Sequence, residues 1–205
     1  HATDPGVFIR SMASRGHLGG LAAAAPQALR VLDACGFDVV LLETVGVGQS
    51  EVEVVGQADT VLVLLAPGMG DGVQVAKAGI LEIADVFVIN KADRDGVSAT
   101  TRDLRGMLAL NPAGEQVWVP PIVKTVATTG EGVDDVLAAV HHHQEWSHHS
   151  GGLFERRVRR VRREIEGIAL DRVRDHLGDA RDLAVRVLDG EIDPYAAAQE
   201  LTEGR

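Results

Sequence analysis

The chain is organised around residues 37–49, in which the apolar run FDVVLL leads into ETVGVGQ, a carboxylate followed by a glycine loop. A short, partly β-branched apolar run bounded by glycines is typical of a strand covered on both faces, and such sheets bind ligands at the carboxyl ends of their strands. There, Glu43 can hold Mg²⁺ through a water molecule, and the backbone N–H of Gly46 can approach a terminal phosphate. The stretch predicts a sensor of a nucleotide γ-phosphate, although similar stretches occur in α/β proteins that bind no nucleotide.

A second apolar run, residues 86–89, is followed by Asn90-Lys91-Ala92-Asp93. The Asp93 carboxylate can accept both N1–H and N2–H₂ of guanine, whereas adenine presents no such pair of donors. Because the wrong base would leave these polar groups unpaired, we expect the site to reject ATP. Lys91 can lay its alkyl stem over the base, and Asn90 can tie the loop to neighbouring segments. The alternative is a plain polar turn after a strand.

A third strand is expected over residues 122–125, and it ends in Thr125-Val126-Ala127. The backbone N–H of Ala127 can donate to guanine O6, an atom that adenine replaces with an amino donor. The tripeptide is a weak indication by itself. The turn Thr129-Gly130-Glu131-Gly132 then leads into a helix expected over residues 133–149.

The remaining pattern predicts a P-loop NTPase-like α/β fold, with a parallel sheet flanked by helices. Gly36 is a C-cap signal for the helix before the central strand. We expect a GTP-binding domain over residues 1–150 and a helical extension over 151–205. The other expected elements are strands at 7–10 and 60–66, helices at 21–35, 50–56 and 97–110, and loops at 11–20 and 67–72.

The extension begins after Gly151-Gly152 with an arginine-rich helix, residues 155–164, which we interpret as a solvated face or an oligomer contact. Asp193-Pro194 predicts the start of a last helix. Helical arms of this kind pack against a partner, so we expect a homodimer. His141, Glu145 and His148 share one helical face and offer a metal site as an alternative, but a solvated helix end explains them as well.

Composition narrows the range of functions. The net charge of −10 and an aromatic content of 3% argue against a nucleic-acid surface. The single cysteine, Cys35, rules out a disulfide framework within the chain, is expected to be a buried thiol, and fits a reducing cytoplasm. No apolar run is long enough to span a membrane, and we expect no signal peptide. The chain contains no Gly-x-x-x-x-Gly-Lys-Ser/Thr, so we expect the phosphate loop in an amino-terminal region that these residues do not include.

The sequence resembles the MeaB/ArgK family of GTPases, which includes the methylmalonic aciduria type A protein. The resemblance covers nearly the whole chain, and ETVGVGQ is its most specific part. Its motifs are RGHLGG at 15–20, ETVGVGQSE at 43–51, PGMGD at 67–71, NKAD at 90–93 and VKTVA at 123–127.

The resemblance implies a homodimeric G protein that hydrolyses GTP to GDP as a chaperone of adenosylcobalamin-dependent methylmalonyl-CoA mutase, gating cofactor delivery and protecting the mutase. By position it assigns Glu43 to the Mg²⁺ and catalytic neighbourhood, Gly46 to the γ-phosphate, and the 90–93 motif to guanine. Residues 68–73 match a switch that contacts the mutase, but Gly72-Val73 departs from the family pattern. The phosphate loop and first Mg²⁺-ligating aspartates are expected upstream, so the catalytic residue stays open.

Other functions remain open at this point. One is an ATPase or kinase that serves arginine and ornithine transport, which Asp93 argues against. Another is a GTPase that inserts nickel, which tight metal binding by the histidines around His141 would support. A third, of a different class, is a binding scaffold without catalysis, because the chain carries no phosphate loop of its own.

Overall fold

The structure is a computed structural model, and it describes residues 3–12, 24–44, 56–68, 80–110, 117–177 and 180–203. The chain divides into two units, His1–Arg159 and Arg160–Arg205. The first unit contains the sheet and the helices that cover it. The second contains the distal part of a long helix and a pair of short helices.

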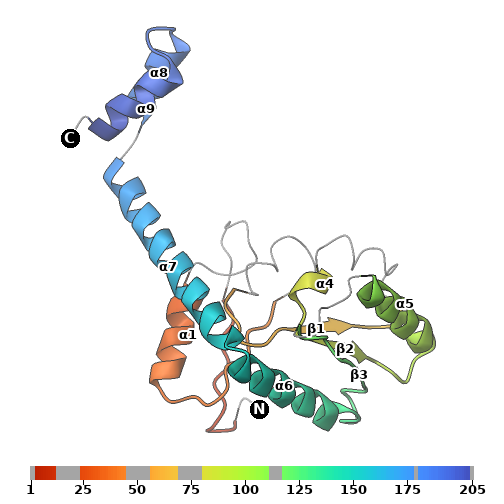
Figure 1. The fold of residues 1–205 in the computed structure, drawn as a ribbon. Helices are drawn as coiled ribbons and strands as arrows, with labels where there is room; N and C mark the ends of the chain where they lie inside the picture. The colour runs from red at the N-terminus through yellow and green to blue at the C-terminus, as the bar shows by residue number, and fades with distance from the viewer. Residues whose placement is uncertain are drawn as a thin grey trace. The chain divides into compact units, whose positions relative to one another are not determined.

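A parallel sheet forms the centre of the first unit (Figure 1). Its strands are β1 (Leu62–Leu65), β2 (Val86–Asn90) and β3 (Ile122–Thr125), in the order β1-β2-β3. Both pairs of neighbours are parallel, and Asn90 lies opposite Thr125 in the register. Strands β2 and β3 therefore end together, at the same edge of the sheet.

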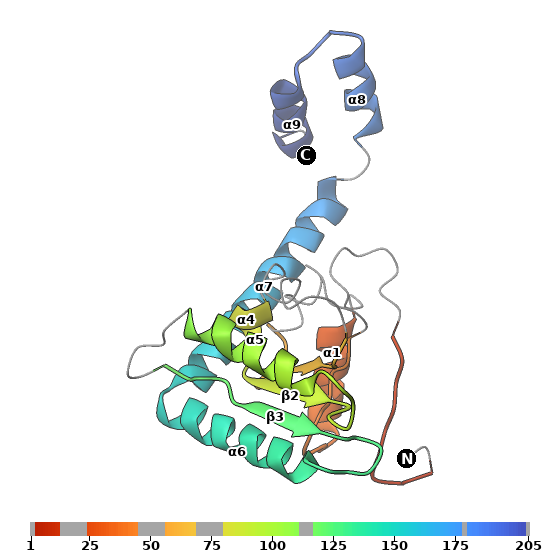
Figure 2. The same ribbon diagram turned by 90° about the vertical axis from the view of Figure 1, so that its right-hand side faces the viewer.

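Strand β2 is buried on both faces, as its unbroken apolar run VFVI predicts. Phe87 and Ile89 are fully buried, and Phe87 packs in the core with Val63 of β1 and Leu104. Leu104 belongs to α5 (Val97–Ala109), which covers one face of the sheet, while α6 (Val133–His149) lies on the opposite face (Figure 2). The predicted class, a parallel α/β sheet flanked by helices, is confirmed.

Helix α1 (Ala25–Ala34) begins later than the sequence pattern predicts, with Pro26 in its first turn. It ends as expected before Gly36, which has a φ of +81°. Cys35, the C-cap residue of this helix, is exposed rather than buried as the sequence predicts. A short helix, α4 (Ile80–Ile83), precedes β2.

Two predicted strands are absent from the described residues. Residues 7–10 and 37–43 join no strand, and apolar side chains in both are exposed, with Ile9 at 69% and Leu41 at 88%. The rings of Phe8 and Phe37 lie 6.4 Å apart, so the two segments contact each other. A buried strand needs a hydrogen-bonded neighbour and cover on both faces, and the described part of the chain supplies neither.

The long helix α7 (Gly152–Leu177) starts in the first unit and continues into the second. Within the second unit, α8 (Arg181–Leu188) and α9 (Pro194–Glu203) contact each other, and Arg186 pairs with Glu200 at 2.7 Å. The predicted cap of α9 is confirmed, because Asp193 Oδ1 accepts the N–H groups of Tyr195 and Ala196. No helix in the described ranges is both long and apolar enough to cross a membrane.

Candidate functional site

The paired ends of β2 and β3 bring together two turns that the sequence placed in one site. The turn after β2 contains Lys91 and Asp93, and the turn after β3 runs from Val126 to Glu131. A backbone hydrogen bond of 3.0 Å from Ala92 N to Thr125 O links them directly. Parallel strands that end in register therefore hold both turns at one edge, where ligands of parallel sheets bind.

The side-chain oxygen of Asn90 is the centre of this link. Asn90 Oδ1 accepts hydrogen bonds from the backbone N–H of Lys91 at 2.8 Å, the hydroxyl of Thr125 at 3.2 Å and the backbone N–H of Ala127 at 3.1 Å. Thr125 is only 4% exposed. The expectation that Asn90 ties its loop to neighbouring segments is met by these contacts, and one oxygen fixes both turns.

Lys91 and Asp93 lie on the solvent side of the same turn. Lys91 has a φ of +58°, a left-handed conformation that a non-glycine residue adopts only when its surroundings impose it. Its carbonyl accepts the N–H of Arg94 at 3.0 Å, which closes the turn over Asp93. The Asp93 carboxylate is exposed and makes no hydrogen bond or ion pair within the described part of the chain. This carboxylate is free to accept donors from a ligand.

The turn after β3 is closed by its own backbone. Val126 N donates to Glu131 O at 3.0 Å, and Val126 O accepts the N–H groups of Thr129 and Gly130, each at 3.0 Å. The Thr129 hydroxyl also donates to Val126 O, at 3.1 Å. Ala127 lies exposed at the outer side of this turn. The sequence had suggested a turn here, but not this closure.

The residues assigned to the phosphate side are less well placed. Glu43 is exposed and follows a segment outside the sheet, so the prediction that it stands at the carboxyl end of a sheet strand is wrong. Within the described residues its carboxylate makes no hydrogen bond or ion pair. Gly46 lies outside the described residues, and so does most of the predicted switch at 68–73. An exposed carboxylate fits water-mediated Mg²⁺ binding, since this ion keeps several waters beside one or two carboxylates.

The opposite end of β2 carries a charged cluster that the sequence did not reveal. Asp85, directly before the strand, is 6% exposed and makes a bidentate pair with Arg156 of α7, at 2.7 and 3.0 Å. Asp85 Oδ2 also accepts the N–H of Val61 at 2.8 Å. The fully buried His143 of α6 places Nε2 3.2 Å from Asp85 Oδ1, and its Nδ1 lies 2.9 Å from the Thr60 hydroxyl.

Burial raises the pKa of Asp85, but His143 and Arg156 together outweigh this effect and hold it below the ordinary value. Arg157 pairs with Asp59 at 2.6 Å. The interpretation of the arginine-rich stretch as a solvated face is thus wrong for Arg156, whose side chain is 23% exposed, whereas Arg157 is 58% exposed. Both arginines tie the start of α7 to other residues of the first unit. Spacing along one helix cannot show that a carboxylate about 70 residues earlier in the chain lies opposite.

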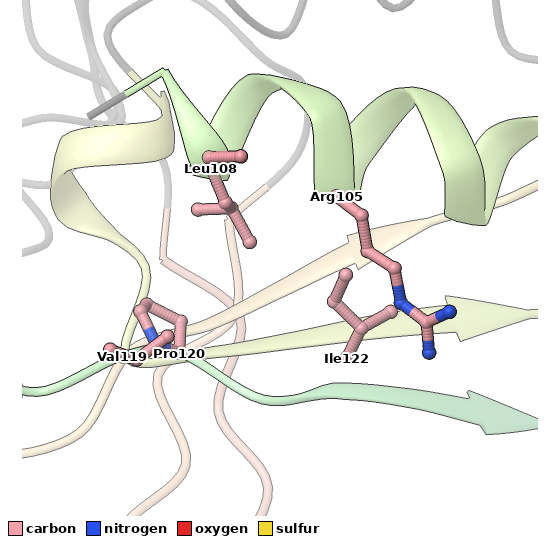
Figure 3. Close-up of a pocket in the computed structure, with 6 residues that line it drawn as sticks. Arg105, Leu108, Val119, Pro120 and Ile122 are labelled. Carbon is pink, nitrogen blue, oxygen red and sulfur yellow. The ribbon is translucent and has the colours of Figure 1, made fainter. Parts of the chain in front are cut away.

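Two other candidate sites, the histidines near His141 and a surface hollow, do not support a function. Among the described residues, no group of histidine, cysteine or acidic side chains has the arrangement of a metal site, so the metal alternative at His141 finds no support. A hollow of about 350 Å³ lies between the end of α5 and the start of β3 (Figure 3). Arg105, Leu108, Pro120 and Ile122 line it, at the end of β3 away from Ala127.

The fold and the two linked turns place the chain among parallel α/β proteins whose ligand sites lie at the carboxyl edge of the sheet. Residues 1–182 match the family model described as methylmalonyl Co-A mutase-associated GTPase MeaB. The chain belongs to this family.

The names of individual relatives agree with this family. A Pyrococcus horikoshii protein, provisionally named a GTPase, is 47% identical over an alignment of 209 positions that covers 99% of this chain and 66% of the relative. The mouse methylmalonic aciduria type A homolog is 30% identical, across 97% of this chain and 50% of its own length. GTPase ArgK of Escherichia coli is 38% identical over 65% of this chain and 41% of its own length. This chain thus spans about two thirds or less of these relatives.

A solved structure shares the fold. A crystal structure of an LAO/AO transport system kinase superposes with a TM-score of 0.62 at 26% identity, and the likeness covers 88% of this chain and 61% of that one. This neighbour supports the predicted P-loop NTPase-like class.

Proposed function

We propose that the chain is the guanine-recognising part of a GTPase that hydrolyses GTP to GDP and phosphate. The observation that carries the proposal is the set of hydrogen bonds at Asn90 Oδ1, which holds the two turns together. Asp93 would accept N1–H and N2–H₂ of the base, and Lys91 would cover its plane. Ala127 N–H would be shared between Asn90 Oδ1 and guanine O6 as a three-centre hydrogen bond. Adenine offers an amino group where this donor needs an acceptor.

Family membership supports hydrolysis. In this proposal Glu43 holds a water of Mg²⁺ and Gly46 contacts the γ-phosphate, while the phosphate loop is supplied by a region outside these 205 residues. Mg²⁺ would neutralise charge on the phosphates during transfer to water. The single cysteine fits a reducing cytoplasm, where we place the protein.

We further propose that the partner is an adenosylcobalamin-dependent methylmalonyl-CoA mutase, for which the GTPase acts as a chaperone. The support is the family description, which names that mutase, and the relative named for methylmalonic aciduria. Residues 68–73 would contact the mutase and respond to the nucleotide.

The experiment for both proposals is phosphate release by the full-length protein with GTP or ATP, with and without the mutase of the same organism. We expect slow GTP turnover that the mutase accelerates, and no ATP turnover. GTP turnover that ignores the mutase would leave the GTPase standing and remove the chaperone role. Equal turnover of GTP and ATP would remove both.

We also propose a homodimer, with residues 1–150 as the GTP-binding domain and 151–205 as the dimerisation extension. Apolar side chains on α7 recur at alternating intervals of four and three residues, the spacing of a coiled-coil seam. All are exposed by 44% or more: Phe154, Val158, Val161, Ile165 and Ile168. A second copy of the helix would bury this seam.

Ile165→Glu would place a charge in the seam, and we expect it to convert a dimer into a monomer in size-exclusion chromatography with light scattering. Leu170→Glu is the matched control, because Leu170 is 58% exposed on the same helix but lies outside the seam. A wild-type monomer at micromolar concentration would contradict the dimer, and equal effects of the two variants would contradict the seam.

A further inference from the structure

The turn that presents Ala127 contains two glycines with left-handed backbones and different surroundings. Gly130 has a φ of +81° and Gly132 a φ of +75°, angles that L side chains rarely adopt. A Cβ on Gly130 would meet no atom within 4 Å. A Cβ on Gly132 would overlap the carbonyl oxygen of Lys124 and lie 3.3 Å from Thr125 Cα. Only Gly132 is pressed against β3.

This close approach sets where the turn lies. Gly132 follows Glu131, whose carbonyl accepts the Val126 N–H and so closes the turn. Ala127 is the next residue after Val126, and its N–H points to Asn90 Oδ1 at 3.1 Å. A side chain at position 132 would have to push the closed turn away from the β3 backbone, and Ala127 would move with it.

We propose that Gly132 is a positioning residue of the guanine site, because its missing side chain lets the turn settle on β3 and aims the Ala127 amide at O6 of the base. This inference rests on the proposed function. It adds a residue that would not contact the nucleotide itself and acts through the placement of one backbone donor.

The two glycines provide a matched pair of variants. Gly130→Ala and Gly132→Ala both force alanine into a left-handed conformation, so both carry a similar backbone strain. Only Gly132→Ala adds the clash with Lys124. A difference between the variants therefore reports the position of the turn and not the strain of the substitution.

The measurement is the affinity of the full-length protein for GDP and for the diphosphate of 2-aminopurine riboside, by titration calorimetry. The analogue keeps the 2-amino group of guanine but has neither its N1–H nor its O6, so Asp93 would hold it by one donor only and it gains nothing from the Ala127 amide. We expect Gly132→Ala to lower the affinity for GDP about tenfold, as for one lost hydrogen bond, and to leave the affinity for the analogue nearly unchanged. The ratio of the two affinities should fall in Gly132→Ala and hold in Gly130→Ala.

Equal ratios in the two variants would overturn the inference while leaving guanine recognition intact. A wild-type protein that binds ADP as well as GDP would instead overturn the proposed function. Should Gly132→Ala not fold, Thr129→Val takes its place, because it removes a hydroxyl that closes the same turn without adding a clash. We then expect a smaller fall in the ratio, of about threefold, and an unchanged ratio would refute the proposal.

Discussion

Asp85 and Asp93 flank the same strand, β2, but their surroundings are opposite. Asp85, at the amino end, is 6% exposed and paired with Arg156 and His143. Asp93, at the carboxyl end, is exposed and has no partner within the described residues. A buried carboxylate is tolerated only when its charge is compensated, whereas an exposed one keeps its water. The same residue type therefore stabilises the fold at one end and stays available for a ligand at the other.

The two ends also differ in what holds them. At the amino end, the carboxylate of Asp85, directly before β2, contacts side chains from α6 and α7. The carboxyl end is held mainly by backbone groups that converge on one neutral oxygen, Asn90 Oδ1. Substitutions at the amino end should thus change stability, and substitutions at the carboxyl end should change binding.

The largest effect is expected from Asp85→Ala. The variant leaves the Val61 N–H without its acceptor and the buried His143 and Arg156 without their partner, so we expect a loss of about 3 kcal/mol in the free energy of unfolding. Urea denaturation followed by tryptophan fluorescence would measure it. Trp118 suits this purpose, since its indole N–H donates to Asp85 O at 2.7 Å.

Glu166→Ala is the matched control. Glu166 also pairs with an arginine of α7, Arg162, at 2.8 Å, but both side chains are more than half exposed. Water and ions screen such a pair, so the urea midpoint should stay where it is. If the two variants unfold at the same urea concentration, burial does not determine how much an ion pair contributes to the stability of this protein.

Asp93→Asn should act on binding alone. The amide cannot accept both guanine donors, and we expect GDP affinity to fall by about 10- to 100-fold with an unchanged urea midpoint. Xanthine carries a carbonyl where guanine carries the amino group, so the variant should gain affinity for xanthosine diphosphate. Calorimetry with both nucleotides checks this. Unchanged GDP affinity would remove Asp93 from the site and break the comparison.

The smallest effect is expected in acid. The pKa of Asp85 in the folded protein lies below its ordinary value of 3.8, so its contribution to stability is complete above that value. The contribution is lost as the pH falls through the lowered pKa, because the unfolded chain takes up the proton first. Between pH 5 and pH 2, the free energy of unfolding should therefore decrease less steeply with falling pH for Asp85→Asn than for the wild type. If the free energy of unfolding depends on pH in the same way in both proteins, another group controls the loss of stability in acid.

Strands β2 and β3 and helices α5 and α6 match the predictions within a residue or two, because each has a strong pattern of its own. An unbroken apolar run between turn signals is covered on both faces, and helices preceded by left-handed glycines begin where expected. The motif that we propose to bind the base, residues 90–93, can be read from the sequence for the same reason: its residues are consecutive, and the end of the strand fixes where they lie.

Residues 37–43 show where this reasoning fails. Their apolar run is as strong as that of β2, but Val39 and Leu41 are 72% and 88% exposed. At one edge of the described sheet, Leu64 of β1 is 59% exposed as well. A strand is stable only when another strand satisfies its backbone, and the sequence of one segment says nothing about whether that neighbour is in place.

The sequence by itself determined the class of fold, the family and the residues that we propose to recognise a base, because these depend on short stretches whose chemistry is local. Only the tertiary structure decided which charges are buried and which are free. It paired Asp85 with Arg156, left Asp93 in solvent, and pressed Gly132 against Lys124. Such contacts join residues far apart in the chain or depend on the path of a closed turn, and burial sets their energy.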